Sequence, residues 1–365
     1  MPSLPQASWT RLGMDVHRDS IWICTLRPDG SDDVERIFND EASIRRFMHR
    51  FEGPHHVTAC YEAGPTGYEL QRLLEQRLGI PCIVVAPSLI PKAPGDRVKT
   101  DRRDCRRLAR LYRAGELTPI RVPSVDEEAV RDLCRARADA MEDLHRARRR
   151  LGAFLLRHGE IWRGGSTWSL KHEDWLLSRR FEDPALASTF AHYRATVEER
   201  RTRLHTMEMD LLTYCDKDPF ADCVRRLRAY RGVSDLGALT LAAEVCDWRR
   251  FPRASTFMGF VGLVASESSS GDRTYRGHIT KAGNVHIRTQ LIESAWAYQH
   301  MASVGVRLRQ RHEGCPPDTV ARAWRAQVRL CGRFRRLSAR KNVKSVVATA
   351  VARELSGFLW AEMTA

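Results

Sequence analysis

The feature that most constrains this chain is an acidic residue, Asp15, at the end of an apolar run that has the pattern of a strand. Leu12 and Met14 precede it, and residues 20–26 form a second run of β-branched and apolar side chains. Two such runs joined by a short turn predict a β-hairpin in which Asp15 ends the first strand. A carboxylate inside a sheet is costly unless a metal ion or an arginine compensates its charge. The alternative is a turn aspartate that faces water.

Strands and helices alternate in the residues that follow, up to position 115. Further strands are predicted at 34–38, 56–61 and 81–85, and helices at 41–51 and 65–78, the first of them capped by Asn39 or Asp40. Three antiparallel strands followed by strands that helices separate give the element order of an RNase H-like (RuvC-like) α/β domain. We assign this domain to residues 1–118.

Three further acids accompany Asp15 in this domain. Glu62 follows the fourth strand directly before a Gly/Pro turn, and ligand sites of α/β sheets gather at such strand ends. Asp101 and Asp104 stand three residues apart at the start of a predicted helix, so their side chains share one face. Four carboxylates that converge could hold divalent cations, which prefer oxygen ligands. For Asp101 and Asp104 the alternative is ordinary stabilisation of a helix N-terminus.

The charge balance indicates a nucleic-acid partner. The 365 residues include 60 Lys and Arg against 45 Asp and Glu, which gives a net charge of +15 and a pI near 9.7. A basic surface attracts phosphate, and the planar guanidinium group of arginine suits it. The longest apolar runs, such as residues 80–86, are too short to span a bilayer, and the N-terminus lacks the pattern of a signal peptide. We therefore expect a cytoplasmic, nucleoid-associated protein with no membrane partner.

Cysteine and histidine do not indicate a metal centre. The ten cysteines include no Cys-x-x-Cys pair and lie mostly in apolar patterns, so we expect buried, reduced thiols rather than zinc ligands or disulfides. The thirteen histidines form no His-x-x-x-His or Cys-His cluster. Zinc is not predicted.

Two long helices are predicted in a linker region at residues 119–220. Apolar side chains recur at heptad-like spacing in residues 125–158 and again in residues 186–214. They predict an antiparallel coiled-coil hairpin, or a seam for a partner subunit. Arg146 and Arg149 belong to a basic cluster on the first helix, which is either a solvated face or a face that follows phosphates.

Residues 221–365 are predicted to form a helical, basic domain. Residues 227–245 have the pattern of a helix-hairpin-helix, whose turn amides can bind a backbone phosphate, although the same residues describe an ordinary turn and N-cap. Residues 266–271 are four serines, a glutamate and a glycine, close to the basic residues Arg273, Arg276 and Lys281. Serines beside glycine are typical of a flexible loop, and no sequence-adjacent arrangement of His and Asp marks one of them as a nucleophile.

A second basic segment lies at residues 321–344, where Trp324 and Phe334 are interleaved with the charges. Such a mixture suits contact with backbone phosphates and stacking on unpaired bases. For each aromatic residue the alternative is packing in the core. In this segment we expect contacts to nucleic acid from Arg329, Arg333, Arg336 and Lys341.

Three motifs carry a family resemblance. Gly13-Met-Asp-Val-His17, Tyr61-Glu-Ala-Gly64 and Lys99-Thr-Asp-Arg-Arg-Asp104 resemble the Asp-Glu-Asp-Asp motifs of insertion-sequence (IS) transposases of the IS110 type, whose first domain is similar to Holliday-junction resolvases. The resemblance covers nearly the whole chain. It implies a Mg²⁺ site, with Mn²⁺ as a substitute, whose ligands are Asp15, Glu62, Asp101 and Asp104.

The resemblance also suggests a nucleophile. Residues 251–297 resemble the C-terminal transposase domain of the same family, in which the serine before the glycine attacks a DNA phosphate. That serine is Ser270 here, and the run of three serines leaves Ser269 as the reserve. Ala265 stands where the family commonly has proline.

The function implied is that of an RNA-guided DNA recombinase, a serine recombinase directed by a structured bridge RNA. It would join donor and target DNA through a phosphoserine intermediate, as a homo-oligomer (dimer or tetramer), with the acids and magnesium assisting from another domain or subunit. Arg102 and Arg103 are further expected contacts to nucleic acid. The alternatives are a metal-dependent nuclease that acts by hydrolysis and a non-enzymatic RNA- or DNA-binding protein.

Overall fold

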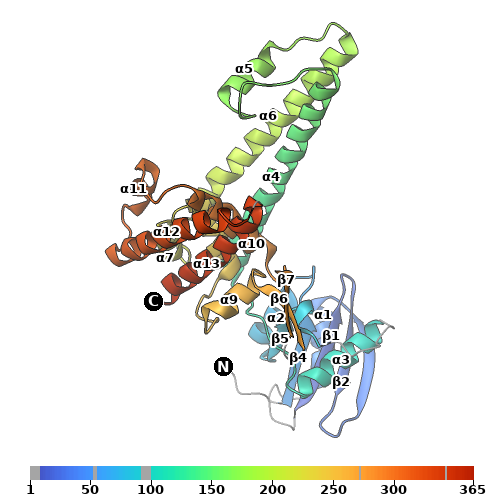
Figure 1. Cartoon of the computed structure of the whole chain (residues 1–365). Coiled ribbons are helices and arrows are strands. Elements are labelled where there is room, and N and C mark those ends of the chain that lie inside the picture. Colours follow the sequence, from blue (N-terminus) through green and yellow to red (C-terminus); the bar gives the residue numbers. More distant parts are fainter. Residues whose placement is uncertain (1–8, 52–55, 92–99, 271–272, 342) are drawn as a thin grey trace. The chain divides into compact units, whose positions relative to one another are not determined.

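The computed structural model describes residues 9–51, 56–91, 100–270, 273–341 and 343–365, while the side chains of Ser269 and Ser270 fall outside that description. Lys99, which opens the third motif, also lies outside the described residues. The chain divides into two compact units, Met1–Val122 and Pro123–Ala365, and each is described by itself (Figure 1).

The first unit is built on a five-stranded mixed sheet in the order β3-β2-β1-β4-β5. Strands β1 (Thr10–Val16), β2 (Ser20–Leu26) and β3 (Asp32–Phe38) are antiparallel neighbours. Strands β4 (Val57–Glu62) and β5 (Cys82–Val85) continue the sheet parallel to β1. The predicted hairpin, the third strand and both helix-separated strands are confirmed, and β3 begins two residues before its predicted start.

Helices cover both faces of this sheet (Figure 1). Helix α1 (Glu41–Met48) and helix α2 (Glu69–Arg72), which continues as a π-helical turn over Leu73–Arg77, pack against the face of Leu12 and Met14. Helix α3 (Asp101–Arg113) covers the other face, where Cys105 and Ala109 meet β2. A 3₁₀ turn, Pro87–Leu89, follows β5.

Local backbone features determine where the first two helices of this unit begin. Asp40 caps α1, since its carboxylate accepts a hydrogen bond from the Ser43 N–H at 2.8 Å. The helix predicted from residue 65 begins only at Glu69, because Gly67 adopts a left-handed conformation (φ 66°) that interrupts a helix. The first unit is thus a mixed α/β domain.

Two long helices open the second unit and run antiparallel (Figure 1). They are α4 (Val125–Arg157) and α6 (Pro184–Leu212), and the late residue Phe154 of α4 meets the early residue Phe190 of α6, whereas Arg137 pairs with Glu208. A short helix, α5 (Leu170–Ser178), lies in the connection between them and was not predicted. We call the region from residue 145 to residue 201 that includes this connection the hairpin tip.

The rest of the second unit is a helical body with one small sheet. Its helices are α7 (Ala221–Leu227), α8 (Asp235–Val245), α9 (Ala254–Phe260), α10 (Val285–Ala295), α11 (Val306–His312), α12 (Pro317–Ser338) and α13 (Lys344–Thr364), with a 3₁₀ turn at Trp296–Gln299. Strands β6 (Ala265–Ser270) and β7 (Arg273–Ile279) form the two-stranded sheet. One apolar core joins these helices, except α11, and also receives Val130 and Cys134 from the start of α4. No helix within the described ranges is long and apolar enough to cross a bilayer.

Of the helix-hairpin-helix predicted at residues 227–245, the turn and the second helix, α8, are present, whereas the first helix, α7, precedes this range and ends at Leu227. Ser234 caps α8, accepting a hydrogen bond from the Gly237 N–H at 3.1 Å. The turn packs tightly on α10, because a Cβ at Gly232 would lie 2.2 Å from the Ser294 carbonyl oxygen. Its role in phosphate binding stays a prediction.

The ten cysteines are all free, as predicted, and seven of them are buried while Cys223, Cys246 and Cys315 are half-buried. Burial raises the pKa of Cys134 to about 11 and that of Cys105 to about 12. These thiols are therefore protonated at neutral pH and pack as small apolar side chains.

A buried carboxylate, that of Glu362, ties the last helix to the rest of the body. It accepts hydrogen bonds from Thr319 Oγ1 at 2.7 Å, Arg226 Nε at 3.0 Å and Tyr230 Oη at 3.1 Å, and it also pairs with Arg322. Burial raises its pKa, but the hydrogen bonds from Arg322, Thr319 and Arg226 outweigh burial and hold the pKa at about 2. Glu362 is therefore ionised across the physiological range.

Candidate active site

The end of β1 presents polar groups on the face that α3 covers. Alternate residues of a strand share a face, so Gly13, Asp15 and His17 point the same way while Leu12 and Met14 enter the core on the other side. The side chain of Asp15 is 23% exposed and that of His17 is 48% exposed. Asn39 steadies the turn after β1, because its Nδ2 donates to the His17 carbonyl oxygen at 2.8 Å.

Gly13 allows α3 to reach this strand end. A Cβ at Gly13 would lie 2.2 Å from the Cys105 carbonyl oxygen and 2.4 Å from the Ala109 nitrogen, so only a glycine lets the helix backbone approach so closely. The helix begins at Asp101, and Thr100 caps it by accepting a hydrogen bond from the Arg103 N–H. The first carboxylate of α3 is thereby placed beside Asp15.

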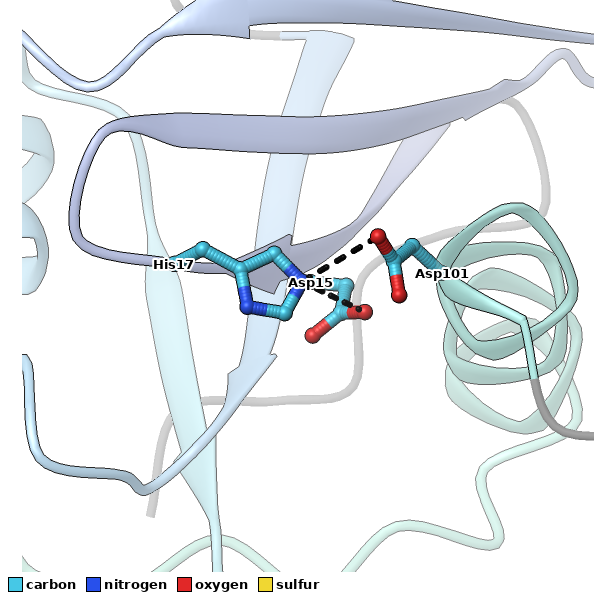
Figure 2. Close-up of side chains that lie close together, drawn as sticks. All are labelled: Asp15, His17 and Asp101. Atoms are coloured by element: carbon cyan, nitrogen blue, oxygen red, sulfur yellow. Dashed lines mark ion pairs between the residues drawn. The ribbon is translucent and has the colours of Figure 1, made fainter.

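Three side chains meet there (Figure 2). His17 Nε2 lies 3.4 Å from Asp15 Oδ2 and 3.4 Å from Asp101 Oδ2. One ligand atom of each residue lies within 4.8 Å of the others. Two carboxylates and one imidazole fit a divalent cation, since carboxylate oxygens suit Mg²⁺ and Mn²⁺ and the imidazole nitrogen suits transition metals better than Mg²⁺. We call Asp15, His17 and Asp101 the acid cluster.

The other two predicted ligands lie near this cluster without joining it. Glu62 is the last residue of β4, and the parallel register that pairs Met14 with Tyr61 would, continued by one residue, set Glu62 beside Asp15. Its side chain is exposed. Asp104 is half-buried one turn further along α3. Within the described residues, the group with metal-ligand spacing contains neither Glu62 nor Asp104.

His17 is the residue that the sequence interpretation missed. Paired histidines or cysteines are the usual sequence pattern of a metal site, whereas His17 is a single histidine whose partners are acids. The available signal was the Asp-x-His spacing at a strand end, which puts both side chains on one face of the sheet. Asp15 and Asp101, which the sequence analysis assigned to one metal site, do lie together in the structure, and His17 is the unexpected third member.

The segment that carries Ser270 is a β-hairpin, and the prediction of a flexible loop was wrong. Strands β6 and β7 pair in antiparallel fashion, with Ser268 opposite Tyr275 and Ser270 opposite Arg273. Strand β7 contains Thr274, Tyr275 and Ile279, whose side chains favour strands. The serines of β6 are held in a strand by backbone pairing with β7. Residues 271 and 272 lie outside the described residues. Ser270 is therefore the last residue of a strand.

A buried ion pair anchors the base of this serine hairpin. Glu244, in α8, accepts hydrogen bonds from Arg135 Nε at 2.7 Å and Arg135 Nη2 at 2.9 Å, and also from Asn284 Nδ2 at 2.7 Å. Asn284 in turn caps α10, and its backbone N–H donates to the Phe260 carbonyl oxygen at 3.3 Å. The chain that leaves β7 is thus fixed to α4, α8 and α9.

The predicted nucleic-acid contacts are mostly exposed, but several are paired with acids. Arg146 and Arg149 pair with Glu142, Arg276 pairs with Glu267, and Arg329 and Arg333 contact Glu354 of α13. The predicted contacts for which no ion pair is found among the described residues are Arg102, Arg103, Arg273, Lys281, Arg336 and Lys341. Exposed ion pairs are weak, so a phosphate can displace these carboxylates.

The aromatic residues of the second basic segment differ from one another. Phe334 is buried against the ring of Trp296 and cannot stack on a base, because it belongs to the core. Trp324 is 42% exposed and keeps an accessible ring. The basic face of α12 therefore offers one aromatic side chain to a ligand.

Comparison with known proteins defines the class. Residues 12–159 match a DEDD transposase family of the IS110 type, and residues 224–311 match the transposase IS116/IS110/IS902 family. The y4qE protein of Sinorhizobium fredii is 46% identical over 319 residues, which are 87% of this chain and 77% of that protein. The transposase for insertion sequence element IS1533 of Leptospira borgpetersenii is 32% identical over 340 residues, 90% of this chain and 97% of that protein.

The protein is therefore a transposase, an enzyme that cuts and rejoins DNA. More particularly, the chain belongs to the IS116/IS110/IS902 family of insertion-sequence transposases. A DEDD-type family suggests a divalent metal ion, and the donor set of the acid cluster is of the kind that such an ion requires.

Proposed function

We propose that this transposase is an RNA-guided recombinase that exchanges strands through a phosphoserine at Ser270. The acid residues Asp15, Glu62, Asp101 and Asp104 assist by holding Mg²⁺. The observation that carries the proposal is the acid cluster at the end of β1, in a sheet whose strand order supports the RNase H-like interpretation. When bound, the metal ion would supply positive charge to the reacting phosphate.

The proposed chemistry is a transfer in two stages. The Ser270 Oγ forms a bond to the phosphorus of the DNA backbone while the bond from that phosphorus to a deoxyribose oxygen breaks, and the leaving oxygen takes up the proton that the serine hydroxyl loses. A hydroxyl of the second strand then attacks the phosphoserine and restores Ser270. Because each step exchanges one phosphoester for another, no nucleotide cofactor is consumed.

The serine needs assistance, because a hydroxyl is a weak nucleophile until a base or a metal activates it. Ser270 and the acid cluster belong to different compact units of the chain. We therefore expect cleavage to require an assembled complex of an oligomer with DNA and a structured guide RNA. Sequencing the RNA that copurifies with the protein would test RNA guidance: a single structured species encoded beside the gene is expected, and a random sample of cellular RNA would contradict it.

The metal site is tested by replacing one of its acids. Asp15→Asn should leave the fold intact, weaken Mn²⁺ binding in calorimetry by at least about tenfold and abolish strand exchange, because the neutral amide is a poor ligand. Asp19→Asn is the matched control, since Asp19 is an exposed acid in the turn directly after β1 and outside the cluster. Normal strand exchange by Asp15→Asn in magnesium buffer would show that the site is misassigned.

A hydrolytic nuclease is the second candidate. The acid cluster is compatible with it as well, because carboxylates with a divalent ion can also activate water for attack on phosphate. The products separate the two mechanisms: hydrolysis leaves no covalent link between protein and DNA, and strand transfer through a serine does.

A further inference from the structure

The hairpin tip contains a hollow that none of the proposed chemistry uses. It has a volume of about 380 Å³ and is lined by residues of α4, by Thr167 and Trp168, and by His172 of α5. Arg148, Arg149 and His145 contribute the basic groups of its lining, and Trp168 and the aliphatic side chains of α4 contribute the apolar part. No carboxylate is among the lining residues. A hollow of this composition suits an anion that also carries an apolar or aromatic group.

Arg148 is held in this hollow without an ion-pair partner in the described part of the chain. Its guanidinium carbon lies 4.7 Å from the centre of the Trp168 ring, and its Nε is buried with no hydrogen-bond partner. Burial lowers the pKa of Arg148 and the nearby charge of Arg201 lowers it further, while the charge of Glu173 has a weaker, opposite effect. The buried Nε is out of reach of a ligand, but a half-buried guanidinium group without an ion pair can still bind a phosphate oxygen through its terminal nitrogens.

The ring of Trp168 is fixed in place before any ligand arrives. The Trp168 backbone N–H donates to His172 Nδ1 at 3.2 Å, and the two rings lie 5.3 Å apart at 70°. His172 is itself buried and stacked on Trp175. Because this aromatic platform is already ordered, little entropy is lost when a ligand binds to it.

Gly152 is a second and independent sign of a ligand. It lies in the interior of α4 with an ordinary helical backbone, and a Cβ added there would meet nothing within 4 Å. Neither backbone conformation nor packing within the chain requires glycine, and glycine destabilises a helix interior relative to alanine. Gly152 lines the hollow, so its missing side chain leaves that space open. A close approach of a ligand to the helix backbone explains the glycine.

We propose that the hairpin tip binds one unpaired nucleotide of a single-stranded nucleic acid. Its phosphate contacts Arg148 and Arg149, and its base occupies the apolar part of the hollow beside Trp168. Stacking on an aromatic side chain next to a cation is how single strands are held without regard to sequence. This site is separate from Ser270 and from the acid cluster, and it requires neither RNA guidance nor a phosphoserine intermediate.

The experiment uses the full-length protein, labelled oligothymidylate and oligouridylate, and inorganic phosphate as a competitor. Gly152→Leu fills the hollow and favours the helix, and Arg148→Gln removes the cation. Each should weaken binding of one oligonucleotide by about tenfold or more. The controls are Ala153→Leu and Arg150→Gln, which change exposed neighbours on α4 that do not line the hollow and should alter affinity less than about threefold.

A second readout isolates this site from other basic surfaces. Photocrosslinking of a halogenated oligonucleotide should map to the peptide that contains Trp168 in the normal protein and should vanish in Gly152→Leu. The preferred oligonucleotide distinguishes DNA from RNA as the source of the nucleotide. Equal losses in Arg148→Gln and Arg150→Gln, with no effect of Gly152→Leu and no crosslink at Trp168, would overturn the proposal. A change of oligomeric state in Gly152→Leu without loss of binding would overturn it as well, in favour of a contact between protein chains.

Discussion

Replacing Gly13 by alanine should move Asp101, at the start of α3, away from Asp15 and His17, at the end of β1, without changing any of the three side chains. The new Cβ would lie 2.2 Å from the Cys105 carbonyl oxygen and 2.4 Å from the Ala109 nitrogen. Both atoms belong to the backbone of α3, so no side-chain rotation can make room. The helix must move away from β1, and Asp101 moves with it.

The size of this movement follows from the separation that nonbonded atoms keep. Heavy atoms approach to about 3.5 Å, so the helix has to retreat by about 1 Å at Gly13. The Asp101 and Asp15 carboxylates each lie 3.4 Å from His17 Nε2. After the movement they could no longer bind the same metal ion. A displacement of about 1 Å at a reacting centre costs roughly 100-fold in rate. Overpacking of this kind should also lower the free energy of unfolding by about 1–3 kcal/mol.

The assay combines metal binding with catalysis. Gly13→Ala should keep its circular dichroism spectrum, bind Mn²⁺ at least about tenfold more weakly in calorimetry and recombine DNA about 100-fold more slowly. Gly332→Ala is the matched control, because Gly332 lies in α12 and the same added methyl group meets nothing within 4 Å. If folded Gly13→Ala binds Mn²⁺ and recombines DNA at the normal rate, the close approach of α3 does not set the geometry of the site.

Two further predictions concern charge. The pKa of Glu362 is lowered from 4.5 to about 2 in the folded protein. The ionised carboxylate therefore stabilises the fold by about 3 kcal/mol above pH 4.5, and this stabilisation is lost as the pH falls through 2. Between pH 5 and pH 2, Glu362→Gln should therefore show a smaller fall in unfolding free energy than the normal protein in denaturant titrations, and identical pH dependence would contradict the assignment. Replacing Arg329, Arg333 and Arg336 together by glutamine should lower the salt dependence of nucleic-acid binding by about one unit of slope for each phosphate that the variant no longer binds, whereas an unchanged slope would show that these residues face solvent.

The first unit could be predicted well because local patterns determine it. The alternation around Leu12 and Met14 identifies β1, and the same strand ends position Asp15 and Glu62. The acid cluster could be predicted only in part, because it depends on the path of α3 over Gly13, a contact between residues about ninety positions apart. Local patterns do not reveal that path, so the sequence analysis did not identify His17 as a member of the site. It also predicted Glu62 and Asp104 as ligands together with Asp15, whereas in the structure they lie outside the acid cluster.

Less of the second unit could be predicted from local sequence patterns. Heptad-like spacing located α4 and α6, but it carries no information on the hairpin tip, where Trp168, His172 and Trp175 form a small aromatic cluster around α5. The serine hairpin was missed because serine and glycine favour turns by local preference. Pairing with Thr274 and Tyr275 overrides that preference.

The central claim is a covalent bond between Ser270 and DNA, and its most direct measurement is a denaturant-quenched reaction followed by protease digestion and mass spectrometry. The proposal predicts a nucleotide-bearing peptide that spans residues 266–273 and is modified at Ser270. The adduct should be absent from Ser270→Ala, which should still bind nucleic acid, and present in Ser269→Ala. Normal DNA cleavage by both variants with no adduct would contradict the claim and establish hydrolysis assisted by the acid cluster.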